Sequence, residues 1–260
     1  MNALPSDGPV RVEVCDDGRF WKIVLQRPPQ NWLGEEMIDA LLAAFAAARE
    51  APELRATLLI GDGPNFSLGT DPATLDRDGA IRSTRLFLDL IRSILDTPVF
   101  RIAVLRGQCM GRGLELARVC NRVYAEKDAR IGLPEIEMGL FPAAASVILP
   151  ERIGRGPAGE LCATGYVKDA VEASWMALVD HAVDDAESFA IAEVRQFLSG
   201  LSASSLRLAL RALDQGFRAR VLEGLDAVEQ LYCGELWRTE DAVEGVTAKR
   251  EGRQPVWRHR

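Results

Sequence analysis

The stretch GRGLE, residues 111–115, decides how the rest of this sequence is interpreted. It follows a strand-like run over 99–105, so we predict that it ends a loop and opens a short helix. Two glycines at a helix start allow close approach to the backbone, and the N–H groups of the first turn have no partner within the helix. The positive helix end also favours a developing negative charge. Such a loop would suit a thioester carbonyl that becomes an enolate.

Two other interpretations of this stretch stay open. A Gly-x-Gly step also occurs in phosphate-binding loops, although those carry a third glycine or a following Lys-Ser/Thr that this chain lacks. An acid in the first turn also complements the helix dipole. Glu115 is therefore either a catalytic carboxylate or a structural one.

The region before this stretch alternates strand-like and helix-like patterns. An Asp-Gly turn joins the first two strands, and apolar residues at helical spacing mark the first helix. This alternation predicts an α/β fold with parallel strand pairing. The expected strands are 10–15, 19–26, 56–60, 99–105 and 122–125, and the expected helices are 34–50 and 81–95.

Beyond residue 143 the pattern becomes helical, and the last segment carries a broad apolar face that the same core or another subunit must cover. No repeat or flexible linker interrupts the chain. We therefore expect one functional unit, with a core over 1–200 and a helical region over 201–260. The expected helices are 143–152, 157–163, 169–175, 186–199, 203–214 and 217–236.

Composition excludes several classes of protein. The chain has 260 residues, of which 48% are hydrophobic and 27% charged, as in ordinary soluble domains. A net charge of −7 argues against nucleic acid or an anionic membrane as the partner. Five cysteines without a CxxC pair, and two histidines, predict free thiols and no metal site. Without a spanning run or a secretory signal, a cytoplasmic location is expected.

Two further stretches carry candidate chemistry. In NFSLGTD, residues 65–71, Gly69 permits a tight backbone that leaves neighbouring N–H groups free for a ligand, although an ordinary turn has the same composition. In GLPEIEMGLFP, residues 132–142, Glu135 follows Glu115 by 20 positions. Taken alone, Glu115 and Glu135 are explained equally well as exposed cap or loop residues as by a catalytic role. Glu137 is expected to be a solvated residue.

The order and spacing of these stretches, with Arg27-Pro28-x-x-Asn31-x-Leu33 before them, resemble the enoyl-CoA hydratase/isomerase (crotonase) superfamily over about residues 10–250. The resemblance implies a crotonase-like spiral of ββα units with a helical C-terminal trimerisation region. A homotrimer or homohexamer is therefore expected. It also implies an acyl-CoA substrate, with coenzyme A as part of the substrate and no separate cofactor.

The same resemblance assigns the site. It places the oxyanion-hole donors on the backbone N–H groups of Leu68 and Arg112, and the acid/base pair on Glu115 and Glu135. Glu115 would act as base toward water and Glu135 as proton donor, with the roles exchanged in the reverse direction. Both glutamates together favour a hydro-lyase, which adds or removes water. Substrate or coenzyme A contacts are expected from Ser67, Gly69, Thr70, Asp71 and Gly111.

A narrower resemblance concerns the acyl group. Residues 134–141, 144–146, 149–150 and 201–207 are similar to cyclohexa-1,5-diene-1-carbonyl-CoA hydratases. Most crotonases carry Pro-Gly-x-Gly-Gly where this chain has PAAAS, residues 142–146. The resemblance implies hydration of a cyclic dienoyl thioester by 1,4-addition, in fatty acid or aromatic degradation.

Arg112 departs from the pattern, because the hydratases have glycine there. Either its side chain points away and bonds a nearby carboxylate, or it enters the pocket, pairs with Glu115 or Glu135 and lowers that pKa. Three functions follow from these alternatives: a hydratase, another crotonase reaction such as isomerisation or thioester hydrolysis, and a non-catalytic acyl-CoA binding protein.

Overall fold

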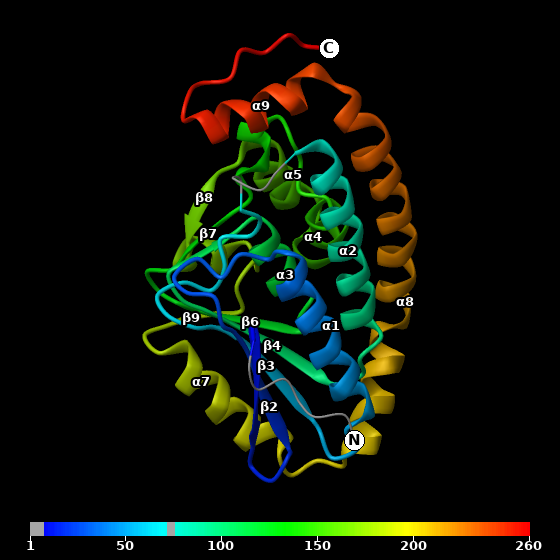
Figure 1. Cartoon of the computed structure of the whole chain (residues 1–260). Coiled ribbons are helices and arrows are strands. Elements are labelled where there is room, and N and C mark those ends of the chain that lie inside the picture. The colour runs from blue at the N-terminus through cyan, green and yellow to red at the C-terminus, as the bar shows by residue number, and fades with distance from the viewer. Residues whose placement is uncertain (1–7, 72–75) are drawn as a thin grey trace.

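The computed structural model describes residues 8–71 and 76–260, and its centre is a mixed sheet (Figure 1). Within these residues, six strands pair in the order β1-β2-β3-β4-β6-β9; β1 is antiparallel to β2 and the other neighbours are parallel. The predicted α/β fold with parallel pairing is confirmed. The strands are β1 Val10–Cys15, β2 Phe20–Leu25, β3 Ala56–Gly61, β4 Phe100–Leu105, β6 Arg122–Glu126 and β9 His181–Val183.

A smaller sheet connects the loops that carry the candidate motifs. It consists of β5 (Gln108–Met110), β7 (Arg130–Gly132) and β8 (Val167–Asp169), in that order. Helix α3 (Arg112–Arg118) begins immediately after β5. The GRGLE stretch therefore opens the predicted short helix, although strand β5, which the sequence analysis did not predict, leads into it in place of a loop.

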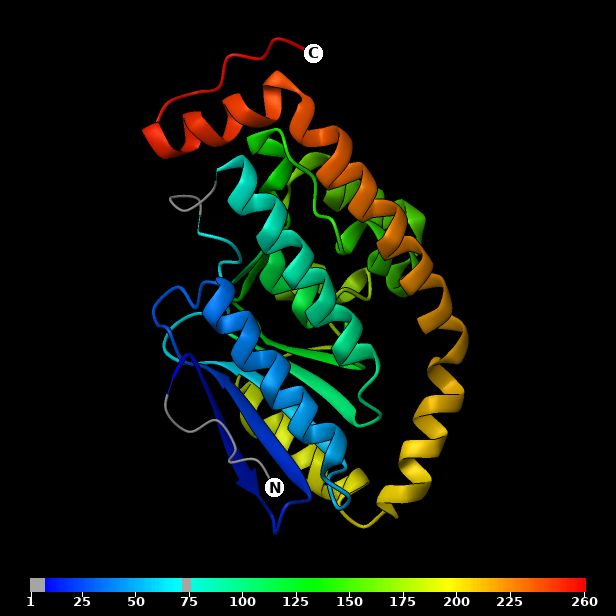
Figure 2. The same cartoon turned by 45° about the vertical axis from the view of Figure 1, so that its right-hand side comes forward.

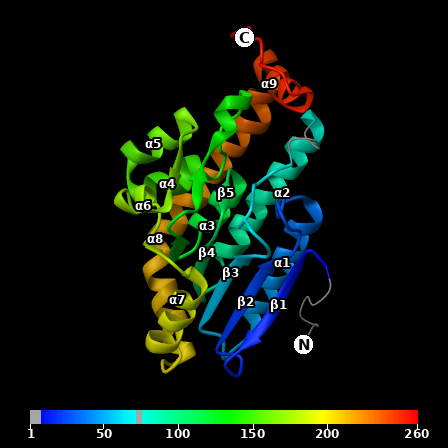
Figure 3. The ribbon, with the colours of Figure 1, turned by 90° about the vertical axis from the view of Figure 1, so that its left-hand side faces the viewer.

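Helices cover both faces of the large sheet (Figure 3). On one face α1 (Glu35–Glu50) and α2 (Arg77–Leu95) pack with α3 over the inward side chains of the strands. On the other face, α7 (Ala186–Glu193) and the following π-turn η3 (Val194–Leu198) cover a second apolar cluster that includes Leu58 and Val104. α2 begins four residues earlier than expected, because the Asp76 carboxylate caps it by accepting from the Gly79 N–H.

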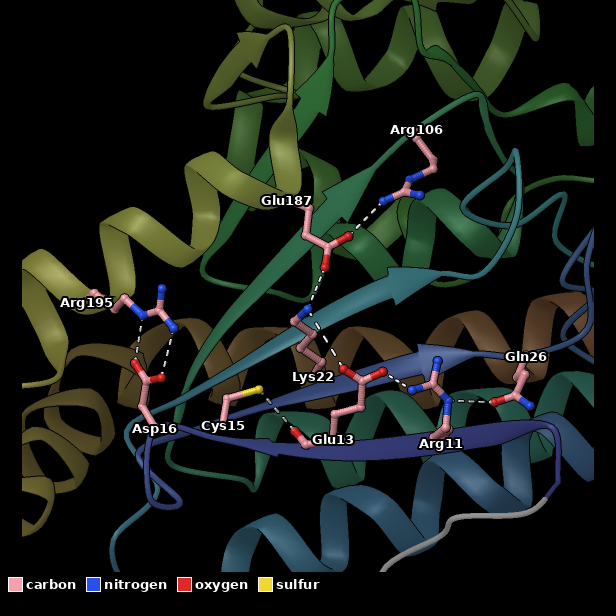
Figure 4. Close-up of polar contacts among 9 residues, drawn as sticks. All are labelled: Arg11, Glu13, Cys15, Asp16, Lys22, Gln26, Arg106, Glu187 and Arg195. Atoms are coloured by element: carbon pink, nitrogen blue, oxygen red, sulfur yellow. Dashed lines mark hydrogen bonds and ion pairs between the residues drawn. The ribbon is translucent and has the colours of Figure 1, made fainter.

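Charged side chains join β2 and the residue after β4 to α7 (Figure 4). The Glu187 carboxylate of α7 accepts from Lys22 Nζ at 2.7 Å and from Arg106 Nη2 at 2.9 Å. Arg195 of η3, about two turns further on, donates to Asp16 at 2.8 Å. These pairs are partly exposed, so each contributes at most about 1 kcal/mol, and the apolar cluster supplies most of the attachment.

The C-terminal half is helical and shares the main core. α8 (Ala203–Glu229) runs along α2 and α4 (Figure 2), and it buries Val221 and Leu225 against them. The sequence predicted two helices here, 203–214 and 217–236; one helix instead continues through Gly216 to Glu229. The remaining helices are α4 Ala145–Ile153, α5 Arg155–Thr164, α6 Ala170–Trp175 and α9 Glu240–Glu251, with short turns η2 Pro134–Met138, η4 Gln230–Glu235 and η5 Leu236–Arg238.

The last helix packs closely against η2. A side chain at Gly245 of α9 would bring its Cβ within 2.1 Å of the Met138 carbonyl oxygen. Gly139, left-handed at φ 67°, ends η2 and lies against the Asp241 carbonyl and the Trp257 ring. Backbone-to-backbone contact, which only glycine permits, therefore sets the position of η2. None of the described helices combines the length and apolar character that crossing a membrane requires.

Candidate active site

Six of the nine predicted site residues line one cavity of about 250 Å³. The loop after β3 contributes Leu68 and Thr70, and the start of α3 contributes Gly111, Arg112 and Glu115. η2 contributes Glu135. Residues that the sequence analysis did not single out complete the wall: Thr84 and Phe87 of α2, Phe141 and Tyr232. Nothing in the local sequence marks the α2 residues, because only the packing of α2 beside α3 brings them there.

Close backbone contacts hold the turn between β5 and α3 against the loop after β3 and against the end of β7. The Met110 N–H donates to the Ser67 carbonyl at 2.9 Å, and the Gly111 N–H donates to the Gly132 carbonyl at 2.9 Å. A Cβ on Gly69 would lie 2.7 Å from the Met110 oxygen, and one on Gly113 would lie 2.6 Å from the Ser67 oxygen. These glycines therefore permit the contact that joins two stretches more than 40 positions apart.

Asn31, in the segment 27–33 named in the sequence analysis, supports the loop after β3. Asn31 is fully buried, and its Nδ2 donates to the carbonyls of Asn65 and Phe66 at 2.9 and 3.2 Å. Ser67 Oγ donates to the Asn31 carbonyl at 2.8 Å and accepts from the Gly69 N–H at 3.1 Å. Ser67 thus fixes the loop instead of facing the cavity. Asp71 lines a neighbouring cavity that shares Thr70 and Trp32 with the first.

The two expected oxyanion donors differ in availability. The Leu68 N–H already donates to the Gln30 carbonyl at 2.9 Å, so this predicted donor is occupied within the protein. Among the described residues, the N–H groups of Thr70 and Arg112 have no such acceptor, and both residues line the cavity. Thr70 follows Gly69, whose φ of 78° turns the chain. The turn at that glycine is the signal that points to Thr70.

Glu115 is enclosed and held by the backbone. Only 2% of it is exposed, and its Oε1 accepts from the Ala145 N–H at the start of α4 at 2.7 Å. Burial raises the pKa of Glu115, while the Ala145 N–H and the Arg112 charge oppose that rise. A hydrogen bond donated to a carboxylate favours its ionised form.

Glu135 is placed differently. η2 reaches the surface, but Glu135 Oε2 is buried and has no hydrogen-bond partner among the described residues. Burial, followed by the charge of Glu115, raises the pKa of Glu135 to about 8. Burial therefore raises the pKa of both carboxyls, and only that of Glu115 is opposed by a hydrogen bond from the backbone of α4.

Gly111 sets the distance between α3 and Glu135. Its φ is 54°, and a Cβ there would lie 2.6 Å from Glu135 Oε1. Gly111 precedes Arg112, so a change at Gly111 would disturb the Glu135 carboxyl and the Arg112 N–H together. Only glycine suits position 111, because the backbone there has a left-handed φ and a Cβ would clash with Glu135.

We expect Gly111→Ala to lower kcat/KM by up to about 10²-fold, because a displaced carboxyl loses its alignment. The strained backbone should also reduce stability by about 1–3 kcal/mol. Steady-state assays and thermal melts measure the two effects. Gly159→Ala in α5 is the matched control, since its Cβ meets nothing within 4 Å. Wild-type kcat/KM in Gly111→Ala would contradict this role.

The Arg112 side chain neither bonds a carboxylate away from the site nor pairs with Glu115 or Glu135, the two alternatives expected from the sequence. It is 8% exposed, Nη1 donates to Ser83 Oγ at 2.5 Å, and Nη2 donates to Thr84 Oγ1 at 2.8 Å. Its guanidinium carbon lies 5.3 Å from the centre of the Phe87 ring. The expectation of a bonded carboxylate is wrong, and among the described residues Arg112 forms no ion pair with either glutamate. The side chain lies against α2, while its charge still favours ionisation of both glutamates.

Comparison with known proteins agrees with this geometry. The family model described as enoyl-CoA hydratase/isomerase matches residues 18–260. The chain belongs to the enoyl-CoA hydratase/isomerase family. It is 38% identical to a cyclohexa-1,5-dienecarbonyl-CoA hydratase of Thauera aromatica, over 98% of this chain and 99% of the relative. It is 31% identical to a probable enoyl-CoA hydratase, echA8, of Mycobacterium tuberculosis (strain CDC 1551 / Oshkosh), over 94% and 96%.

Solved structures of this family share the fold. An enoyl-CoA hydratase from Mycobacterium avium subsp. paratuberculosis K-10 matches with a TM-score of 0.82 at 25% identity, covering 96% of this chain and 98% of that one. An enoyl-CoA hydratase/isomerase from Pseudoalteromonas atlantica T6c matches with a TM-score of 0.83 at 25% identity, covering 96% and 99%. The crotonase fold expected from the motifs is confirmed, and the chain is an enoyl-CoA hydratase-like enzyme acting on acyl-CoA.

Proposed function

We propose that this enzyme adds water across a carbon–carbon double bond of an acyl-CoA thioester, with a cyclic dienoyl group as its acyl class. The observation that carries the proposal is a pair of glutamates at one cavity, Glu115 buried as a whole and Glu135 with a buried carboxyl oxygen. One is held by a backbone donor, and the other has an unpartnered oxygen and a pKa raised to about 8. The reverse reaction, loss of water, uses the same groups.

The proposed mechanism follows from these placements. The N–H groups of Thr70 and Arg112 bind the thioester oxygen, with Thr70 in the place first expected for Leu68. Ionised Glu115 takes a proton from water as the water oxygen bonds to the unsaturated carbon. The electron pair moves onto the thioester oxygen, where the two donors stabilise the enolate. Protonated Glu135 then delivers its proton to carbon, and the roles exchange in dehydration.

The shape of the cavity supports a compact acyl group. Phe87, Phe141 and Tyr232 line the cavity, and Phe141 packs edge-on against Tyr232 with ring centres 5.2 Å apart. A volume of about 250 Å³ suits a six-membered ring better than a long chain. The name of the Thauera relative points to the same acyl class.

The proposal also includes an oligomeric state and a cellular location. The enzyme would act as a homotrimer or homohexamer in the cytoplasm. Leu208 and Leu213 of α8 are 63% and 74% exposed, and Trp175 at the end of α6 is 80% exposed. Apolar side chains this exposed are typical of surfaces that another subunit covers.

Product analysis tests the reaction type. The purified enzyme is incubated with cyclohexa-1,5-diene-1-carbonyl-CoA and, separately, with crotonyl-CoA, and the thioesters are examined by mass spectrometry. We expect a product heavier by one water, formed faster from the cyclic substrate. An isomer of unchanged mass would assign the enzyme to double-bond isomerisation, release of free coenzyme A would assign it to thioester hydrolysis, and tight binding without turnover to a binding protein.

A further inference from the structure

Arg112 brings a buried positive charge to the cavity wall, and neutral groups alone hold it there. Its guanidinium donates to the hydroxyls of Ser83 and Thr84. Arg101 and Arg118, which are buried as well, each have an aspartate nearby, at 3.1 and 3.8 Å. Among the described residues, Arg112 has no acid at such a distance. A buried cation is costly unless an opposite charge compensates it, so the compensation must come from elsewhere in the cavity.

The two candidate acid/base glutamates lie near this charge. Arg112 and Glu115 are three positions apart on α3, and side chains at this spacing share one helix face, with Cβ atoms about 5–6 Å apart. Glu135 reaches the same helix start, because a Cβ on the preceding Gly111 would lie 2.6 Å from its Oε1. All three charged residues line the one cavity, and the positive charge favours the ionised form of both carboxyls.

Among the described residues, the other titratable groups around these three side chains add no buried charge near neutral pH. They include the thiols of Cys162 and Cys233 and the phenol of Tyr232, and burial raises the pKa of each, so all three stay protonated. Glu137 and Lys249 also line the cavity, but both are exposed to solvent, which screens their charges. The buried charge balance therefore rests on the arginine and the two glutamates.

We propose that the Arg112 side chain is a positioning residue that supplies the counter-charge of the glutamate pair and so maintains one shared proton on it. With one carboxyl ionised, the buried charges cancel; with both protonated or both ionised, a net charge remains. Hydration requires the balanced state, because the base must be ionised while the acid carries a proton. The inference rests on the proposed function for this chemistry, but the charge balance does not depend on it. A hydrocarbon acyl group adds no charge and leaves the balance intact.

The pH dependence of hydration tests this role. Arg112→Gln removes the charge and keeps a polar amide, so both carboxyls should hold their protons more tightly. We expect both limbs of the kcat/KM profile to move to higher pH by about one unit. Arg112→Lys should restore the wild-type limbs. Arg85→Met, which removes an exposed cation of α2 paired with Glu229, should leave them in place. Wild-type limbs in Arg112→Gln overturn the proposal.

Stability measures the same charge balance without turnover. Glu115→Gln and Glu135→Gln each leave one carboxyl to balance Arg112, whereas the double variant leaves the buried cation without a counter-charge. At neutral pH, we expect the urea midpoint of the double variant to fall by more than the sum of the two single falls. Additive falls overturn the proposal, even if no Arg112 variant folds. A non-additive fall in an enzyme that fails to hydrate would reject the proposed reaction and leave the counter-charge role in place.

Discussion

Glu115→Gln is expected to lower kcat for hydration by about 10²–10⁴-fold, the range that a general base contributes. Glutamine keeps an oxygen that accepts the Ala145 N–H, so the start of α4 retains its hydrogen bond. The amide cannot take a proton from water. The loss should therefore appear in kcat, with the affinity for acyl-CoA nearly unchanged.

Steady-state kinetics and acyl-CoA titration together measure this change. Glu137→Gln is the matched control, since Glu137 is exposed on the same turn as Glu135 and has no place in the proposed chemistry. The control should keep wild-type turnover. If Glu115→Gln also keeps it, Glu115 is not the base.

Glu135→Gln should lower kcat by a similar factor, about 10²–10⁴-fold, because the amide does not deliver a proton to carbon. Hydration requires the protonated carboxyl, and the pKa of Glu135 is raised to about 8. Wild-type hydration should therefore fall as pH rises through about 8, and dehydration, which requires the ionised form, should rise over the same range. The residual activity of Glu135→Gln should lack that alkaline limb.

The same carboxyl affects stability with a definite sign. Its pKa is about 8 when folded and near its ordinary 4.5 when unfolded, so the folded state binds the proton more tightly. Its contribution is fully present below pH 4.5 and is lost as pH rises through about 8. Denaturant unfolding at several pH values should show this decline in the wild type and a smaller one in Glu135→Gln. An identical decline in both proteins would show that Glu135 is not the titrating group.

The sequence predicted those parts of the site that depend on local backbone chemistry. Gly69 and Gly113 marked the loops, and their close contact through β5 is what their lack of a Cβ permits. The identity of the first oxyanion donor depends on which N–H groups the fold occupies. Gln30 takes the Leu68 N–H, and no local pattern indicates that bond.

The hydrogen-bond partners of the Arg112 side chain could not be predicted from local sequence either. Its partners Ser83 and Thr84 precede it by 29 and 28 positions, so only the packing of α2 against α3 reveals them. The cation at the start of α3 is tolerated because its side chain extends to two hydroxyls on another helix. A buried arginine is commonly paired with an acid, so the sequence alone favours a carboxylate partner over the two hydroxyls that bind it.

The glycine contact between α9 and η2 makes a distant helix part of the frame of the candidate site. Glu135 sits on a turn whose position depends on Gly245 and on the Trp257 ring, which lie more than 100 positions further along the chain. A larger side chain at Gly245 is therefore expected to displace the Glu135 carboxyl, although Gly245 lies outside the cavity wall.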